Sequence, residues 1–303
     1  INILILGASG FIGSYLSQKI VEKKNCNLRL FSRSEFILEE ANWIQGSLED
    51  EDLLKLALKE INLAYYCLGP SNTLSSWNEP GSTFDSTINP FLKFLGHAVN
   101  AKVNKVSFIS SAGTVYGKNS QVHFEGSMTA PFSPYGIMQL CMENYLRYYN
   151  EKHGLNYDIF RISNPYGPSL IIDKPVYGVI GNWFESIKNK RPLNVINNYL
   201  KVEKDFIFIE DVAELLTVTL KTNLYTSNIY NIGAGKTYSI KNILSHICNI
   251  TNTELDNINL VSFPYDNPVV KISVKKIMDL FSDFELTTLE DGLSKTWKDV
   301  SEK

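Results

Sequence analysis

The opening segment constrains the fold more than any other part of the chain. Residues 3–16 read ILILGASGFIGSYL: an apolar run typical of a buried strand, three glycines spaced by three, and then a helical pattern. In such a segment Gly7 permits a tight turn, Gly10 lets a ligand approach the backbone, and Gly13 lets the helix pack closely on the strand. This strand–turn–helix predicts the first unit of a doubly wound α/β fold.

The same turn predicts a ligand. Backbone N–H groups at the start of a helix have no partner within the helix, and the helix dipole adds positive charge there. We therefore expect a dinucleotide pyrophosphate, from NAD or NADP, to bind at this turn. The residues that would hold it are Gly7, Gly10, Phe11, Ile12 and Gly13. A glycine-rich turn in an α/β domain without cofactor is the alternative.

The end of the second expected strand bears on the choice between NAD and NADP. It reads LFSRS, with Ser32 and Arg33 where an acidic side chain would accept the ribose 2′-hydroxyl. An arginine and a hydroxyl suit a 2′-phosphate. An arginine that stacks on adenine, or is only solvated, explains the residues equally well, so both dinucleotides remain open.

Hydrophobic patterning extends this unit over half of the chain. Short apolar runs alternate with helical stretches, which indicates a parallel sheet with helices on both faces, a Rossmann-type doubly wound α/β fold. We expect a dinucleotide-binding domain over 1–165 and a smaller C-terminal substrate-binding α/β lobe over 166–303, with later segments crossing back. The expected strands are Asn2–Leu6, Leu28–Phe31, Asn42–Ile44, Leu63–Cys67, Lys105–Ile109 and Tyr157–Arg161. The expected helices are Phe11–Glu22, Glu51–Leu58, Asn89–Ala101, Pro134–Lys152, Val179–Asn189, Glu210–Lys221 and Ser239–Ile250.

Composition excludes several classes of partner. The net charge of -3 gives no general attraction to nucleic acid or to an anionic membrane surface. The apolar run at 1–6 is too short for a signal peptide or a membrane span. The 4 cysteines form no CxxC pair and have no histidine at metal-ligand spacing, which predicts reduced thiols, no metal site and a cytoplasmic location.

Six further motifs occur in order along the chain. They are SSAGTVYG (110–117), PYGIMQ (134–139), RISNPYGP (161–168), KDFIFIEDVAE (204–214), YNIGAG (230–235) and LEDGLSKTW (289–297). With them the chain resembles the extended short-chain dehydrogenase/reductase family, in particular its NAD-dependent epimerase/dehydratase branch, which includes UDP-glucose 4-epimerase.

The resemblance implies chemistry at C4 of a UDP- or dTDP-hexose. In this family a tyrosine takes the hydroxyl proton while hydride passes to nicotinamide, and a 4-keto sugar then rotates and takes the hydride back. Tyr135 matches that tyrosine. The resemblance also implies cofactor contacts from Leu68, Gly69, Asn89 and Ser110, and substrate contacts from Asn164, Lys204 and Asp266.

Position 139 departs from the family pattern. The family has YxxxK, with a lysine one helical turn after the tyrosine, and this chain has Gln139. The lysine binds the nicotinamide ribose and its charge favours tyrosinate. Gln139 can still donate a hydrogen bond to the ribose, but it carries no charge. Since about one tyrosine in a thousand is ionised at pH 7 without such help, a large loss of rate is expected.

Two other family positions are altered. Where the family has a serine or threonine that binds the reacting sugar oxygen, this chain has Ala112. Ser111 and Thr114 flank it, and their hydroxyl groups either take over that role or only form hydrogen bonds at the end of the strand. The two arginines that grip the substrate diphosphate correspond to Lys204 and Phe263, so the guanidinium fork is lost at one and all charge at the other.

Three functions remain open from the sequence. The first is an NAD(P)-dependent nucleotide-sugar 4-epimerase. The second is an NADPH-dependent reductase of a 4-keto sugar nucleotide. The third is a scaffold or sensor that binds the cofactor without catalysis. An aromatic stripe on the Tyr135 helix, formed by Tyr145, Tyr148 and Tyr149, further predicts a homodimer.

Overall fold

The structure is a computed structural model that describes residues 1–23, 25–69, 73–171, 178–254, 257–262 and 267–303. Its centre is a seven-stranded sheet with the order β11-β7-β5-β4-β1-β2-β3, in which every neighbouring pair is parallel. The strands are β1 (Asn2–Leu6), β2 (Asn27–Ser32), β3 (Ala41–Gln45), β4 (Leu63–Tyr66), β5 (Lys105–Ser111), β7 (Asn156–Ile162) and β11 (Asn228–Ile232). The Rossmann-type fold is confirmed.

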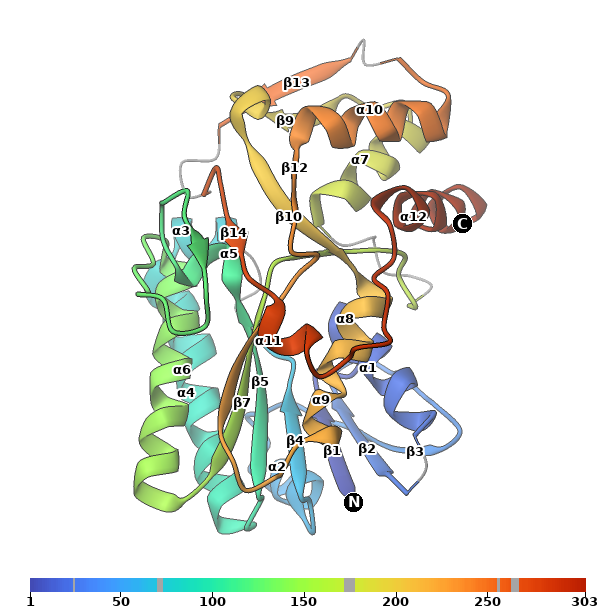
Figure 1. The fold of residues 1–303 in the computed structure, drawn as a ribbon. Helices are drawn as coiled ribbons and strands as arrows, with labels where there is room; N and C mark the ends of the chain where they lie inside the picture. The colour runs from blue at the N-terminus through green and yellow to red at the C-terminus, as the bar shows by residue number, and fades with distance from the viewer. Residues whose placement is uncertain (24, 70–72, 172–177, 255–256, 263–266) are drawn as a thin grey trace.

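Helices cover both faces of this sheet (Figure 1). One face packs on α1 (Phe11–Val21), α8 (Ile209–Leu216), α9 (Val218–Lys221) and α11 (Lys275–Met278), and the other on α2 (Glu51–Leu58), α4 (Pro80–Asn100) and α6 (Pro134–His153). Because both faces are covered, strands such as β1 and β4 are almost wholly buried, which explains their continuous apolar sequence.

The second lobe lies beyond the carboxyl ends of the strands, at the top of Figure 1. It contains a three-stranded sheet of β8 (Asn164–Tyr166), β10 (Glu203–Phe208) and β12 (Thr237–Ser239), and a parallel pair of β9 (Leu193–Ile196) and β13 (Ile258–Val261). Its helices are α7 (Gly178–Lys188), α10 (Ile240–Thr251) and α12 (Leu289–Glu302), and these enclose a separate hydrophobic core. The chain reaches this lobe after β7 and returns to the large sheet with β11.

The remaining elements are short. A second parallel pair joins β6 (Val122–His123) to β14 (Lys271–Ile272), and α3 (Thr73–Asn78), α5 (Ala112–Val115) and a 3-10 turn (Tyr199–Lys201) lie in connections. In the part of the chain that is described, no helix combines the length and the apolar character needed to cross a bilayer.

The expected start of α4 was wrong. The helix begins at Pro80, nine residues before the expected Asn89, and runs through Pro90. Proline inside a pattern usually marks a helix boundary, because it lacks the N–H donor. Here Thr83, Thr87, Ile88 and Phe91 are buried at helical spacing on both sides of Pro90, and this packing carries the helix past the lost hydrogen bond.

Candidate functional site

The glycine turn between β1 and α1 has the close approaches that its sequence suggests. Gly7 has a φ of +82°, and its carbonyl accepts a hydrogen bond of 2.8 Å from the Gly10 amide. A Cβ added to Gly13 would lie 2.2 Å from the same carbonyl, so only glycine fits at that position. The N-cap residue Gly10 has no side chain to occupy the first-turn amides, which leaves the helix start suited to an anion.

A cavity of about 370 Å³ opens beside this turn. It lies at the carboxyl ends of β1, β2 and β4, where open α/β sheets bind ligands. Gly7, Gly10, Ser32, Arg33, Leu68 and Gly69 line it, as does a loop of residues 46–49 after β3. These residues fit a dinucleotide, since the glycine turn and the carboxyl ends of β1, β2 and β4 line one cavity. Phe11 lines a second cavity instead, and Ile12 and Gly13 line neither.

The residues of α4 that line the first cavity do not include Asn89, from which a cofactor contact was expected. Asn89 does not precede a helix but lies within α4, where it is exposed to solvent and lines neither cavity. Ser86, Thr87 and Pro90 line the first cavity in its place. The earlier start of α4 sets the phase of the helix and turns position 89 outward.

Tyr135 lies in the first turn of α6. The helix begins with a Ser–Pro pair, in which the Ser133 hydroxyl accepts a hydrogen bond of 3.2 Å from the Gly136 amide. A Cβ at Gly136 would lie 2.9 Å from the Thr114 carbonyl, so the glycine lets the Tyr135 turn pack against α5.

Gln139 is the hydrogen-bond partner of Tyr135. The two residues are one helical turn apart, and the Gln139 Nε2 donates to the Tyr135 hydroxyl at 3.0 Å. Gln139 is buried, and its Oε1 has no hydrogen-bond partner among the described residues. Burial raises the pKa of Tyr135 above its usual value, and the bond from Gln139 offsets only part of this effect. The tyrosine therefore holds its proton at neutral pH.

Gln139 also lies close to the wall of the first cavity. A Cβ added to Gly69, which lines that cavity at the end of β4, would lie 3.6 Å from the Gln139 Nε2. Tyr135 lines the second cavity. Gln139 itself lines neither cavity, so its hydrogen bond with Tyr135 lies between the second cavity and the Gly69 wall of the first.

The second cavity, of about 1080 Å³, lies between the sheet and the C-terminal lobe. Tyr135, Asn164 and Lys204 line it together, as does Phe11 from α1. The Asn164 Nδ2 donates to the Asp205 carbonyl at 2.7 Å, and the Lys204 ammonium donates to the Asn267 carbonyl. Asp266 and Phe263 lie outside the described residues.

The hydroxyl groups at the end of β5 lie apart from both cavities. The Ser110 Oγ donates to the Glu143 carboxylate at 2.6 Å, and Arg161 binds the same carboxylate at 2.7 Å. Neither Ser111 nor Thr114 is among the residues that line the cavities. Thr114 has a buried Oγ1 that lacks a hydrogen-bond partner.

Sequence reasoning missed several of these residues. Ser86 and Thr87 carried a usable signal, because they lie three and four residues before Pro90 on one helical face. Glu143 lies one turn after Gln139 and fixes α6 to β5 and β7 through Ser110 and Arg161. The loop 46–49 had only a glycine as a signal.

Comparison with known proteins identifies the architecture. The family model described as the NAD dependent epimerase/dehydratase family matches residues 3–233. A putative UDP-glucose 4-epimerase of Methanocaldococcus jannaschii is 28% identical over 253 residues, which are 81% of each chain. A dTDP-4-dehydro-6-deoxyglucose reductase of Escherichia coli is 27% identical over 319 aligned positions, covering 99% of this chain and 97% of the relative.

Solved structures share the fold over the whole chain. The UDP-glucose 4-epimerase of Thermotoga maritima, determined with UDP-glucose, superposes with a TM-score of 0.89 at 23% identity, covering 100% of this chain and 99% of the other. The UDP-glucose 4-epimerase of Thermus thermophilus in complex with NAD gives a TM-score of 0.89 at 20% identity, covering 99% of each chain.

Proposed function

Because this chain belongs to the NAD-dependent epimerase/dehydratase family, we propose that it is an NAD(P)-dependent nucleotide-sugar epimerase acting at C4 of a UDP- or dTDP-hexose. One observation carries the proposal. Tyr135 faces the larger cavity while its hydroxyl is bound by Gln139, which lies close to the Gly69 wall of the smaller, glycine-lined cavity. A proton carrier between a dinucleotide and a sugar requires this position.

The residues divide the work as follows. Gly7, Gly10 and Gly69 would hold a nicotinamide dinucleotide, which when bound would accept hydride from C4 and return it. Tyr135 takes the proton of the C4 hydroxyl and returns it to the C4 oxygen after inversion. Gln139 orients the tyrosine hydroxyl through Nε2, and its unpartnered Oε1 is free to accept a hydrogen bond from a ribose hydroxyl.

The larger cavity suits the substrate. Asn164 and Lys204 offer an amide and a positive charge to the sugar nucleotide. Inversion requires the intermediate 4-keto sugar to turn over before hydride returns, and a cavity of about 1080 Å³ provides space for that movement. Ala112 has no hydroxyl group at the position where the family binds the reacting oxygen. We also propose that Ser111 or Thr114, neither of which lines a cavity in this structure, reaches that oxygen after a small shift of the backbone.

The test uses the purified full chain with UDP-glucose, UDP-galactose and the dTDP equivalents, analysed by NMR. An epimerase interconverts the C4 epimers without net change in dinucleotide and retains hydrogen at C4 in heavy water. Tyr135→Phe should abolish the conversion. An interconversion that survives this substitution would contradict the proposal for Tyr135.

Gln139 favours a second candidate, a 4-keto-sugar-nucleotide reductase. Net reduction begins with a protonated tyrosine, which is the state that burial and the neutral Gln139 amide maintain. Oxidation of the C4 hydroxyl, which is the first step of epimerisation, instead needs the tyrosinate form to take the hydroxyl proton. Saturable oxidation of NADPH by a 4-keto sugar nucleotide, with no epimerisation, would select the reductase. Dinucleotide binding without either activity would select the third function, a catalytically impaired scaffold or sensor.

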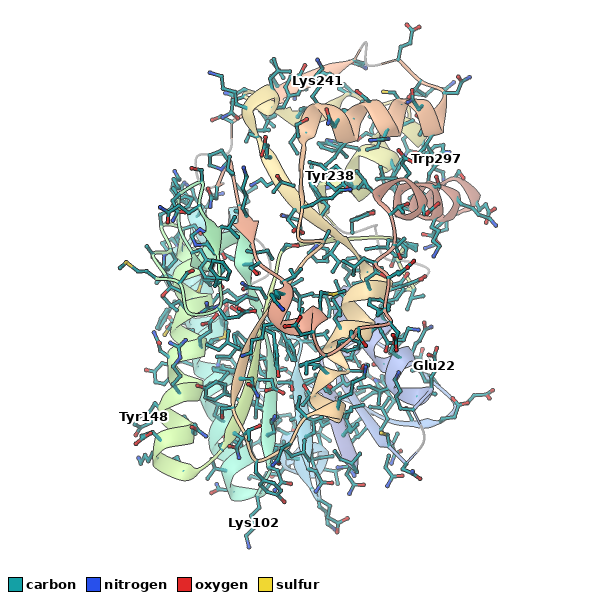
Figure 2. All side chains as sticks on the ribbon, in the orientation of Figure 1. Glu22, Lys102, Tyr148, Tyr238, Lys241 and Trp297 are labelled. Atoms are coloured by element: carbon teal, nitrogen blue, oxygen red, sulfur yellow. The ribbon has the colours of Figure 1, made fainter. Side chains whose placement is uncertain are left out.

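We further propose a homodimer through α6. Ile137 and Tyr148 are exposed on this helix, and Tyr148 lies on the outer side of the molecule (Figure 2). A shallow apolar groove lies between them, lined by Leu140, Cys141 and Tyr145. Light scattering after size exclusion tests the proposal, since Ile137→Glu should convert a dimer into a monomer.

A further inference from the structure

The smaller cavity extends to the ends of β2 and β3, where the adenosine of a bound dinucleotide would lie. We call this part the adenosine end, and it carries a positive side chain to which the proposed function gives no role. Among the described residues that line this cavity, the one cation is Arg33, directly after β2, and the one carboxylate is Glu49, in the loop after β3. Where β2 ends in an acidic residue, that carboxylate accepts the ribose 2′-hydroxyl of NAD. Here β2 ends at Ser32.

The Ser32 hydroxyl is already used within the protein. It donates to the Ser34 carbonyl at 2.8 Å and accepts a hydrogen bond of 3.0 Å from the Trp43 indole. Since a hydroxyl has one hydrogen to donate, Ser32 has none left for a ligand oxygen. Its part is to fix the backbone at the end of β2.

The backbone of Arg33 is fixed while its side chain is not. The Gln45 Nε2 donates to the Arg33 carbonyl at 3.0 Å, which ties this turn to β3. The Arg33 side chain is exposed, and its guanidinium makes no hydrogen bond or ion pair with any described residue. Arg29, on the same strand, differs, because its guanidinium donates to the carbonyls of Leu56, Ala57 and Lys59 at the end of α2.

We propose that Arg33 binds the 2′-phosphate of NADP(H), so that this chain selects the phosphorylated dinucleotide over NAD. A guanidinium presents a planar fork of donors that matches phosphate oxygens. Ser34 and Ser47 line the same cavity and add hydroxyl-bearing residues to its wall. The inference rests on the proposed binding of a dinucleotide, but it concerns the adenosine end and holds whichever way hydride moves at C4.

Glu49 supplies the competing explanation. Its carboxylate lines the same cavity and would repel a 2′-phosphate or, alternatively, accept the ribose hydroxyls of NAD. The two residues therefore predict opposite cofactor preferences, and substituting each of them separates the two explanations.

The experiment is calorimetric titration of the purified chain with NADP, NAD, adenosine 2′,5′-bisphosphate and ADP. We expect NADP to bind at least about tenfold more tightly than NAD, with the same order for the two fragments. Arg33→Gln should weaken NADP binding by about tenfold to a hundredfold, as expected for loss of a charge-assisted contact, and leave NAD within about twofold. Glu49→Gln should leave the preference for NADP in place.

Lys102→Gln is the matched control. Lys102 is an exposed cation at the opposite end of the sheet from the cavity, near the bottom of Figure 2, so its loss changes the net charge equally. The affinity of the Lys102→Gln variant for NADP should equal that of the unmodified chain. Thermal melting verifies that each variant is folded.

Three results would overturn the inference: equal or tighter binding of NAD, an Arg33→Gln variant that keeps its preference for NADP, or an equal loss in Lys102→Gln. A selective loss of NAD affinity in Glu49→Gln would assign the site to NAD. If no dinucleotide binds at all, the proposed function fails as well, and this result is distinct from the others.

Discussion

Replacing Gln139 with lysine tests the most unusual feature of the site. An unperturbed tyrosine is ionised in about one molecule in a thousand at pH 7, and burial lowers that fraction for Tyr135. The Gln139 Nε2 lies 3.0 Å from the tyrosine oxygen. An ammonium at that distance would attract tyrosinate by roughly 5 kcal/mol at an effective dielectric constant of about 20.

Part of that attraction is lost because the lysine must itself be buried. The net effect of one close opposite charge is a decrease of about 1 to 3 units in the tyrosine pKa. The tyrosinate population at pH 7 would then rise by about tenfold to a thousandfold.

The assay is the rate of sugar-nucleotide oxidation as a function of pH, with saturating dinucleotide. In Gln139→Lys the rising limb should move to lower pH by about 1 to 3 units, and the rate at pH 7 should increase at least about tenfold. Gln139→Met, which is neutral and of similar length, should give no such shift. Gln18→Lys, an exposed substitution on α1, controls for added charge.

An unchanged profile would refute the reasoning, provided that Gln139→Lys is folded and binds dinucleotide with its original affinity. Ionisation of Tyr135 would then not limit the reaction. If neither the unmodified chain nor Gln139→Lys turns over any sugar nucleotide, the scaffold is favoured over both enzymatic functions.

Four further predictions address the same sites. Tyr135→Phe should lower turnover at least about a hundredfold with little change in melting temperature, as steady-state kinetics and thermal melting would measure. In the unmodified chain, sugar oxidation should rise about tenfold per pH unit up to pH 9 without a plateau, because the base form of Tyr135 is required and its pKa is raised. Gly13→Ala should weaken dinucleotide binding at least about tenfold in calorimetry, because its Cβ would lie 2.2 Å from the Gly7 carbonyl. Burial raises the pKa of Asp205 to about 6, so the folded chain holds a proton that the unfolded chain releases near pH 4. The contribution of this group to the free energy of unfolding is therefore fully present below about pH 4 and falls by up to about 3 kcal/mol as pH rises through 6; in urea unfolding, the difference between the unmodified chain and Asp205→Asn should change with pH by this amount.

Much of the fold follows from local patterns. The runs that predicted strands fall within one or two residues of β1, β2, β3, β4, β5 and β7. The reason is clearest for β1 and β4, because a strand buried on both faces is apolar throughout. Some elements differ. In α4 the proline signal was overridden by packing on either side of it. The expected helix Glu210–Lys221 is divided at Thr217 into α8 and α9, and β11 was not among the expected strands. The strands of the second lobe are short and pair across long separations, so the sequence indicated their presence but not their partners.

Asn89 and Thr87 illustrate the limit for the site. Positions 87 and 89 are two residues apart, so on a helix their side chains point in directions that differ by about 200°. One of them can therefore face the cavity while the other faces solvent. Thr87 is buried at the cavity and Asn89 is exposed. A helix was thus predicted in this part of the chain, but not where it begins or which of its residues face the cavity.

By itself, the sequence determined the strand–glycine turn–helix that opens the chain, the parallel α/β order and the absence of a lysine at position 139. These depend on residue type and short-range spacing, which the sequence contains directly. Only the tertiary structure decided that the Gln139 amide reaches Tyr135, that Trp43 and Ser34 use up the Ser32 hydroxyl, and that the Arg33 guanidinium has no partner among the described residues. Such contacts depend on how separate strands and loops are brought together, and a hydrogen bond forms or fails within a few tenths of an ångström.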